Sequence, residues 1–192
     1  MTPPQTESHD YPPGDFAMWI FIYAELLVFG IFFLGYAFAR SQNVELFNES
    51  QLHLNRTSGA INTLLLITSS YFVVRAVAAI REGSALLCSR WLFAAIVLAN
   101  LFIIIKMFEF SAKYAEGITL STNTFYMFYL SMTFFHFMHV ILGMVILVAV
   151  MLKARKGGYS DKQYTGVETG ASYWHMVDMV WIILFPLVYV IR

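Results

Sequence analysis

Ionisable side chains stand inside long apolar stretches of this sequence, at spacings that place them on shared helix faces. His136 and His139 occur in FFHFMHV, and His175 and Asp178 occur in SYWHMVDMVW. The members of each pair are three positions apart, so each pair lies on one face of an α-helix. Glu25 stands in a similar stretch, FIYAELLVFG. Such groups are costly in apolar surroundings and by default mark a functional or packing site inside a bundle.

Three kinds of chemistry are open to these residues. In the first, histidines and carboxylates hydrogen-bond to one another and fix the register of the helices. In the second, neutral imidazoles of His136, His139 or His175 bind a haem or a metal ion. In the third, Glu25 or Asp178 exchanges a proton, because scarce water favours the neutral acid. The residue types alone leave all three open.

Several other polar residues carry weaker signals. Arg75 lies toward the end of an apolar stretch and is a further candidate for a polar group inside the membrane. Lys106 and Glu109 are expected to form a surface pair that reaches the lipid headgroups. Cys88 is the only cysteine and is placed in a loop, so neither a disulfide within the chain nor a cysteine metal cage is expected. We expect no metal or other cofactor on this chain.

The elements that must position these residues are membrane helices. Hydrophobic residues make up 59% of the 192 and charged residues only 12%, a balance that soluble domains rarely reach. A span needs about 20 apolar residues, and in lipid only helices or closed barrels satisfy the backbone. The sequence therefore predicts an all-α membrane protein, a bundle of five transmembrane helices over residues 16–39, 59–80, 91–110, 124–151 and about 169–191.

A polar tail at residues 1–15 precedes this single helical domain, which covers residues 16–192. The tail lacks the basic start of a cleavable signal peptide. Lys and Arg are more frequent in the segments around the second and fourth joins, above all in KARK at residues 153–156. Because basic residues favour the cytoplasmic side, we predict the N-terminus inside and the C-terminus outside. The zero net charge argues against a nucleic-acid partner.

Three of the ionisable residues are expected at similar depths in the membrane. A rise of about 1.5 Å per residue places Glu25, Asp178 and His139 at similar distances from the membrane surface. We therefore expect a polar cluster in which His175 and Asp178 bond to Glu25 or His139. The full set of predicted interior polar residues is Glu25, His136, His139, His175 and Asp178, with Arg75 as a possible addition.

Four of the predicted spans carry recognisable motifs in a fixed order. They are MWIFIYAELLVFGIFFLGYAFARS, INTLLLITSSYFVVRA, FYMFYLSMTFFHFMHVILG and YWHMVDMVWIILFPLVYV. Together they resemble helices of subunit III of the haem–copper oxidases. The resemblance places Glu25 at the buried glutamate of that family and the two His-containing pairs in its polar interior. It also implies that haem and metal belong to a partner, the catalytic subunit, and that lipid binds within the bundle.

The short chain and its five spans are most similar to the NorE-type proteins linked to nitric oxide reductase. Lys106 stands where oxidase sequences tend to have Gln, which also favours this type. We therefore expect a non-catalytic accessory subunit in a bacterial cytoplasmic membrane, supporting the assembly, stability or activity of nitric oxide reductase. The alternative is a true subunit III of an oxygen-reducing cytochrome c or quinol oxidase.

A further alternative gives the chain chemistry of its own, as a small haem or metal protein or a proton-coupled carrier. A carrier would have broken helices near the middle of the membrane. Pro186 is the proline that could break a span, and it lies close to residue 192. This alternative is therefore the weakest of those considered.

Overall fold

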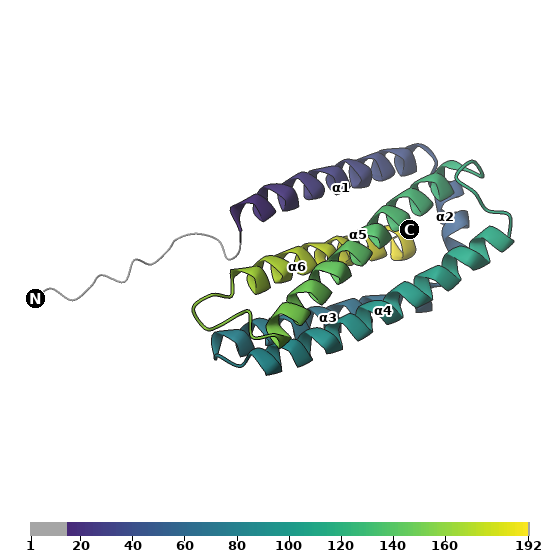
Figure 1. Ribbon diagram of the computed structural model, residues 1–192. Coiled ribbons are helices and arrows are strands. Elements are labelled where there is room, and N and C mark those ends of the chain that lie inside the picture. The colour runs from purple at the N-terminus through teal and green to yellow at the C-terminus, as the bar shows by residue number, and fades with distance from the viewer. Residues whose placement is uncertain (1–14, 192) are drawn as a thin grey trace, which may run out of the picture.

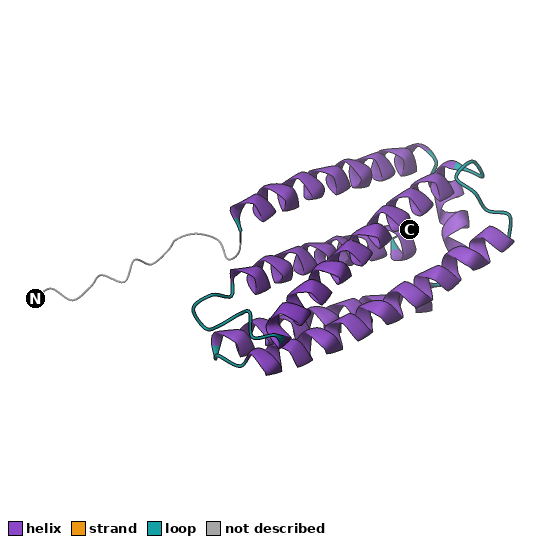
Figure 2. Ribbon diagram, in the orientation of Figure 1, coloured by secondary structure: helices purple, strands orange, loops and turns teal. Residues whose placement is uncertain are grey.

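The computed structural model describes residues 15–191, which form α-helices and a closing π-helical turn, with no strand in that range (Figure 1, Figure 2). Five segments are long and apolar enough to cross a membrane: α1, α3, α4, α5, and α6 continued by the turn η1. The predicted all-α, five-span fold is confirmed. The element bounds are α1 Phe16–Gln42, α2 Val44–Leu52, α3 Arg56–Arg81, α4 Ala85–Ala115, α5 Thr124–Arg155, α6 Thr165–Phe185 and η1 Pro186–Val190.

The starts of three long helices are set by short polar side chains. Asp15, Asn55 and Asn123 precede α1, α3 and α5, and each side chain accepts a hydrogen bond from a backbone N–H of the first turn. Such caps satisfy donors that the helix itself leaves unpaired. Asp15 was assigned to the polar tail, and it serves instead as the boundary of α1. The rest of that tail, residues 1–14, lies outside the described residues.

Three helices end in the same way, each at a glycine with positive φ. Gly83 after α3, Gly117 after α4 and Gly157 after α5 have φ of 77°, 76° and 71°. The residue after each glycine donates its N–H back to a carbonyl in the last helical turn. This is the pattern of a Schellman cap, which needs a left-handed residue and therefore favours glycine. The short joins between spans follow directly from these caps.

The long helices are arranged as a ring with one helix outside it. Each of α3, α4, α5 and α6 packs against two others, so that α3 meets α4, α4 meets α5, α5 meets α6, and α6 meets α3. The first helix, α1, packs against α5 and α6 on one side of this ring (Figure 1). It is the least buried span, with 11% of its most apolar window inside the protein. Most of its apolar surface therefore faces outward.

The helices extend beyond the predicted spans, and two local predictions were wrong as a result. Because Gly83 closes α3 so tightly, α4 begins at Ala85, and Cys88 is a fully buried helical residue rather than a loop residue. At its other end α4 runs on to Ala115, past the predicted limit at Phe110. Lys106 and Glu109 consequently lie well within the helix instead of at its end.

The C-terminal part of the chain is fastened to the first elements. Gln51 of α2 donates a hydrogen bond to the carbonyl oxygen of Val188, at 3.0 Å. Arg40 of α1 donates one to the carbonyl oxygen of Ile191, at 2.5 Å. These bonds satisfy carbonyls that the end of a helix leaves free. The π-helical turn that begins at Pro186 is therefore a fixed part of the bundle, and α6 is continuous from Thr165 to Phe185.

Candidate functional site

One polar link between two spans joins α1 to α5. His139 Nε2 lies 3.0 Å from Glu25 Oε2, and the two side chains are 10% and 18% exposed. His139 Nδ1 lies 2.7 Å from the carbonyl oxygen of Phe135, one turn earlier in α5. This confirms the expectation that Glu25 and His139 meet at one depth. The pair lies at the edge of the bundle, where α1 packs on the ring.

The geometry of His139 fixes how many protons the pair contains. A carbonyl oxygen can only accept, so Nδ1 carries a hydrogen and donates it to Phe135. A neutral imidazole in that form presents a bare Nε2 to Glu25. The Nε2–Oε2 contact therefore requires one more proton, held either by the carboxyl group or by an imidazolium. Glu25 and His139 can hold one transferable proton between them.

His175 has a different partner from the predicted one. Its Nδ1 lies 2.6 Å from the Ser70 hydroxyl on α3, and the structure shows no hydrogen bond from it to Glu25 or His139. Asp178 is also next to Ser70 and is 9% exposed, while its Oδ1 has no hydrogen-bond partner among the described residues. The prediction that His175 and Asp178 satisfy Glu25 or His139 was wrong. The face that they share is turned toward α3, whereas Glu25 is on α1.

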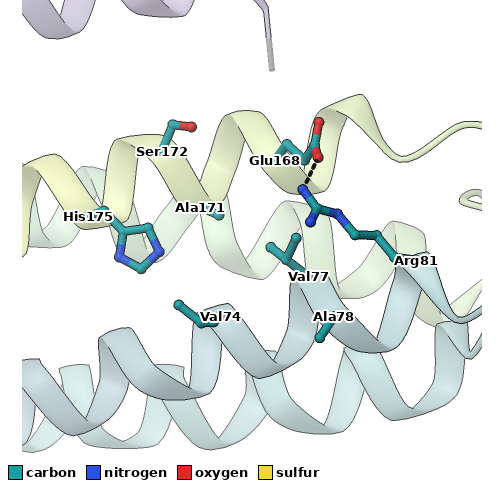
Figure 3. Close-up of a pocket in the computed structure, with 8 residues that line it drawn as sticks. All are labelled: Val74, Val77, Ala78, Arg81, Glu168, Ala171, Ser172 and His175. Carbon is teal, nitrogen blue, oxygen red and sulfur yellow. Dashed lines mark hydrogen bonds and ion pairs between the residues drawn. The ribbon is translucent and has the colours of Figure 1, made fainter. Parts of the chain in front are cut away.

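His175 lines a cavity of about 290 Å³ between α3 and α6. Figure 3 shows His175 at one end and the ion pair of Arg81 with Glu168, 2.8 Å long, at the other. Apolar side chains including Val74 and Val77 form the wall between them. The cavity thus offers polar groups at both ends and an apolar middle.

His136 is separated from His139 although they share a helix. It is fully buried, and neither ring nitrogen has a hydrogen-bond partner among residues 15–191. Its ring stacks on Trp181 of α6, with centroids 5.1 Å apart, and meets the edge of Phe102 of α4 at 5.9 Å. His136 therefore points into the ring of helices while His139 points out to α1. The single cluster predicted for the five residues is instead three separate groups.

Arg75 belongs to none of these groups. Its guanidinium lies 5.5 Å from the centre of the Trp91 ring on α4, which is a cation–π arrangement. The side chain is exposed on the outside of α3. Arg75 thus contributes to the surface of the α3–α4 pair and not to the polar interior.

The most extensive buried polar network was missed from the sequence. Lys106 is fully buried, and its Nζ donates to Glu109 Oε2 at 3.1 Å and to the Tyr189 hydroxyl at 2.8 Å. Glu109 Oε1 accepts from the hydroxyls of Tyr129 at 2.6 Å and Tyr189 at 2.5 Å. The expected surface pair that reaches the headgroups was wrong, because α4 continues beyond it and Tyr189 covers it.

Aromatic rings complete the surroundings of the Lys106 ammonium. The rings of Phe110, Tyr129, Trp181 and Tyr189 have centroids between 5.1 and 5.8 Å from Nζ. A cation over aromatic faces is stabilised most when water is excluded. The recurrence of tyrosine in FYMFYL and PLVYV was the signal available in the sequence, although only the fold shows that both tyrosines meet α4.

The described residues contain no cluster of metal-binding side chains. No three of their His, Cys, Asp and Glu side chains are grouped so that they could hold a metal ion. His139 and His175 are engaged with Glu25 and Ser70, and His136 is enclosed by aromatic rings. What the arrangement supports chemically is hydrogen bonding, charge pairing and the holding of a proton.

The fold and its polar interior define a multi-pass membrane bundle with ionisable groups at the contacts between helices. The family model described as cytochrome c oxidase subunit III matches residues 14–191. Cytochrome c oxidase subunit 3 of Thermostichus vulcanus is 30% identical over 188 residues, which is 96% of this chain and 90% of that protein. Its counterpart from Synechocystis sp. is 31% identical over 193 residues, 99% of this chain and 82% of that protein.

The chain belongs to the cytochrome c oxidase subunit III family. A protein of Aeropyrum pernix named heme-copper oxidase subunit I+III is 29% identical over 181 residues, covering 91% of this chain and 22% of that longer protein. The resemblance predicted from the four motifs is thus confirmed at the level of the family.

Proposed function

We propose that this chain is the accessory subunit III of a haem–copper oxidase in a bacterial cytoplasmic membrane. The observation that carries the proposal is the family match along residues 14–191, together with relatives named oxidase subunit 3 that align over most of both chains. The true subunit III, given as the alternative in the sequence analysis, is favoured over a subunit of nitric oxide reductase.

The partner in this proposal is the catalytic subunit that carries the haem and metal. The Aeropyrum pernix relative supports it, because the name of that single chain joins subunit I with subunit III. The contribution of this chain is to assemble with the catalytic subunit and stabilise it in the membrane.

The Glu25–His139 pair is the group through which this chain takes part in proton handling. It holds one transferable proton at the edge of the ring, and both side chains are partly exposed. An apolar hollow of about 370 Å³ lies beside His139 on the surface of α5. A proton held there is shielded from bulk water and is close to the surface that another subunit can cover.

Association with nitric oxide reductase remains a second candidate, favoured by one observation. Lys106 stands where oxidase sequences tend to have Gln, and it is the centre of a fully buried network. The difference from the oxidases therefore lies in the protein interior and not on its surface. The names of the relatives point to oxidases, and for this reason nitric oxide reductase is the second choice.

The experiment is purification of the tagged full chain from native membranes in mild detergent, with mass spectrometry of partners and absorption spectra for haem. We expect a haem-bearing oxygen-reducing oxidase to copurify, and its oxygen consumption identifies it. Recovery of nitric oxide reductase instead would replace the first candidate by the second. A chain recovered repeatedly without any haem protein would contradict both, provided that an untagged membrane sample processed in parallel sets the background.

A further inference from the structure

The middle of α4 exposes an amide group on the outside of the bundle. Asn100 stands at the midpoint of this helix, which runs from Ala85 to Ala115. At a rise of about 1.5 Å per residue it lies roughly 22 Å from either end, too far for a short side chain to reach water. It is exposed and forms no hydrogen bond with any of residues 15–191. Leaving the donors and the acceptor of an amide unpaired in lipid is costly.

Thr68 and Arg75 are also polar and exposed on a span, but both have partners within the bundle. The Thr68 hydroxyl donates to the carbonyl oxygen of Leu64, one turn earlier in α3. The Arg75 guanidinium lies over the Trp91 ring. Asn100 has no such contact, and acyl chains offer no hydrogen-bonding group. A partner for its amide therefore has to come from another membrane-spanning segment.

Exposed apolar residues continue the line of Asn100 in both directions along α4. Phe93 and Val97 precede it and Ile104 and Met107 follow it, at alternating steps of four and three residues. These four side chains are between 43% and 60% exposed, so they lie on the face of α4 that its neighbours leave free. We call the five residues the α4 seam. Their spacing is that of the contact line between two helices that cross at about 20°.

We propose that a second copy of this chain packs against the α4 seam, with the two Asn100 amides hydrogen-bonded to each other. Two copies inserted in one membrane have the same orientation, so a two-fold axis along the membrane normal sets their α4 helices parallel and in register. Each seam residue then meets its own counterpart at the same depth. An amide is self-complementary, because the NH₂ group of each side chain can donate to the oxygen of the other.

The second copy is favoured over a different protein because it supplies the matching group by symmetry. A helix of another sequence must place an amide or a similar group at the depth of Asn100, whereas the second copy necessarily does so. A single Asn on such a seam specifies how helices pair. Arg90, near the start of α4, opposes the pairing, but its long side chain can turn to the headgroup layer. The inference does not depend on the proposed oxidase partner.

The test measures self-association of the purified full chain in phosphatidylcholine vesicles, by energy transfer between labelled copies over a range of protein-to-lipid ratios. We expect dimers. Asn100→Leu should weaken association by about 10-fold, the order of the contribution of one polar pair between membrane helices. Asn100→Gln keeps the amide and should retain most of the association. The control Thr68→Leu removes an exposed polar group from α3 and should associate as the parent does.

Disulfide cross-linking in the same vesicles locates the contact. Val97→Cys should link two copies under mild oxidation, because equivalent seam residues lie close to the two-fold axis. The native Cys88 is fully buried and gives little background. Leu34→Cys, exposed on α1, is the matched control and should remain unlinked.

A chain that stays monomeric at every ratio would overturn the proposal. So would undiminished association of Asn100→Leu, an equal loss in Thr68→Leu, or cross-linking of Leu34→Cys in place of Val97→Cys. If the chain is monomeric and Asn100→Leu no longer copurifies with a haem protein from native membranes, the seam belongs to a different subunit and the second copy is excluded. If Asn100→Leu loses helical content by circular dichroism, the cross-linking of Val97→Cys decides alone.

Discussion

Lys106 shows how a single buried charge can organise several helices. Its ammonium bonds to Glu109 on the same helix and to Tyr189 of η1, and Tyr129 of α5 donates to the same carboxylate. Every strong donor and acceptor in the group has a partner, which is the condition under which a buried ion pair is tolerated. Removing one charge leaves the other unpaired in a place that water does not reach.

The variant Lys106→Met tests this coupling. We expect it to lower the free energy of unfolding by about 3–5 kcal/mol, because the Glu109 carboxylate is left buried without its counter-charge. Thermal unfolding in detergent measures the loss. The double variant Lys106→Met/Glu109→Gln should lose less than the sum of its single changes, since no charge then remains buried. Strictly additive losses would mean that the two residues act independently, and Lys162→Met, on an exposed residue, serves as the near-neutral control.

Substitutions of Glu25 distinguish the two forms of its pair with His139. In Glu25→Gln the amide can donate to the bare Nε2 of a neutral imidazole, so we expect a small effect. Glu25→Leu leaves Nε2 without a partner and should cost about 1–3 kcal/mol in unfolding free energy. Unfolding temperatures of both variants give the comparison. If Glu25→Gln is as damaging as Glu25→Leu, the contact requires a carboxylate and the proton resides on His139.

At the residue scale the sequence predicted which groups are internal better than it predicted their partners. Glu25 and His139 were placed together because similar depth was sufficient to bring them into contact. The bond of His175 to Ser70 was not predicted, because a serine in an apolar helix carries no distinctive signal and the rotation of each helix about its axis is unknown. That same rotation separates His136 from His139.

Among the helices, α5 and α6 approach each other closely at a glycine. A Cβ on Gly143 would lie 2.9 Å from Trp174 Cε3 and 3.1 Å from Tyr173 Cε1, both atoms of buried rings. Small residues of this kind let membrane helices approach closely in the absence of a hydrophobic driving force. The close packing of α6 against α5 therefore requires a residue without a side chain at position 143.

Gly143→Ala should consequently destabilise the fold by about 1–3 kcal/mol, because the added methyl group displaces a ring in a filled interior. Gly30→Ala is the matched control, since a Cβ there meets nothing within 4 Å. Alanine is the better helix former, so the control should be neutral or stabilising by up to about 1 kcal/mol. Unfolding temperatures in one detergent decide the comparison, and equal losses in both variants would show that helix approach at Gly143 is not limiting.

The elements themselves were largely predictable, and their ends were not. Runs of apolar residues identify five spans because length and composition suffice for that purpose. The end of α4 was predicted too early, at Phe110. The segment SAKYA that follows is polar and was taken as a connection between spans, although the helix continues through it. The short helix α2 was not predicted, because its segment has mixed charge and no periodic apolar pattern.

For the whole molecule, the orientation in the membrane is a prediction that this chain makes easy to test. Cys88 is fully buried, so the chain has little background for thiol labelling. Ser160→Cys, in the α5–α6 join, should be protected from an impermeant maleimide in intact cells, and Leu120→Cys, in the α4–α5 join, should react. Labelling of Ser160→Cys alone would reverse the predicted N-inside arrangement.

The side chains that cover Lys106 are synthesised after Lys106 itself. During synthesis α4 leaves the ribosome long before α6 and η1, which supply Trp181 and Tyr189 to the ammonium. Until then, the contacts of the ammonium are limited to Glu109 and Phe110 of α4 and Tyr129 of α5. An unfinished chain thus displays a polar patch that the finished one conceals. Machinery that removes incomplete membrane proteins could recognise that difference.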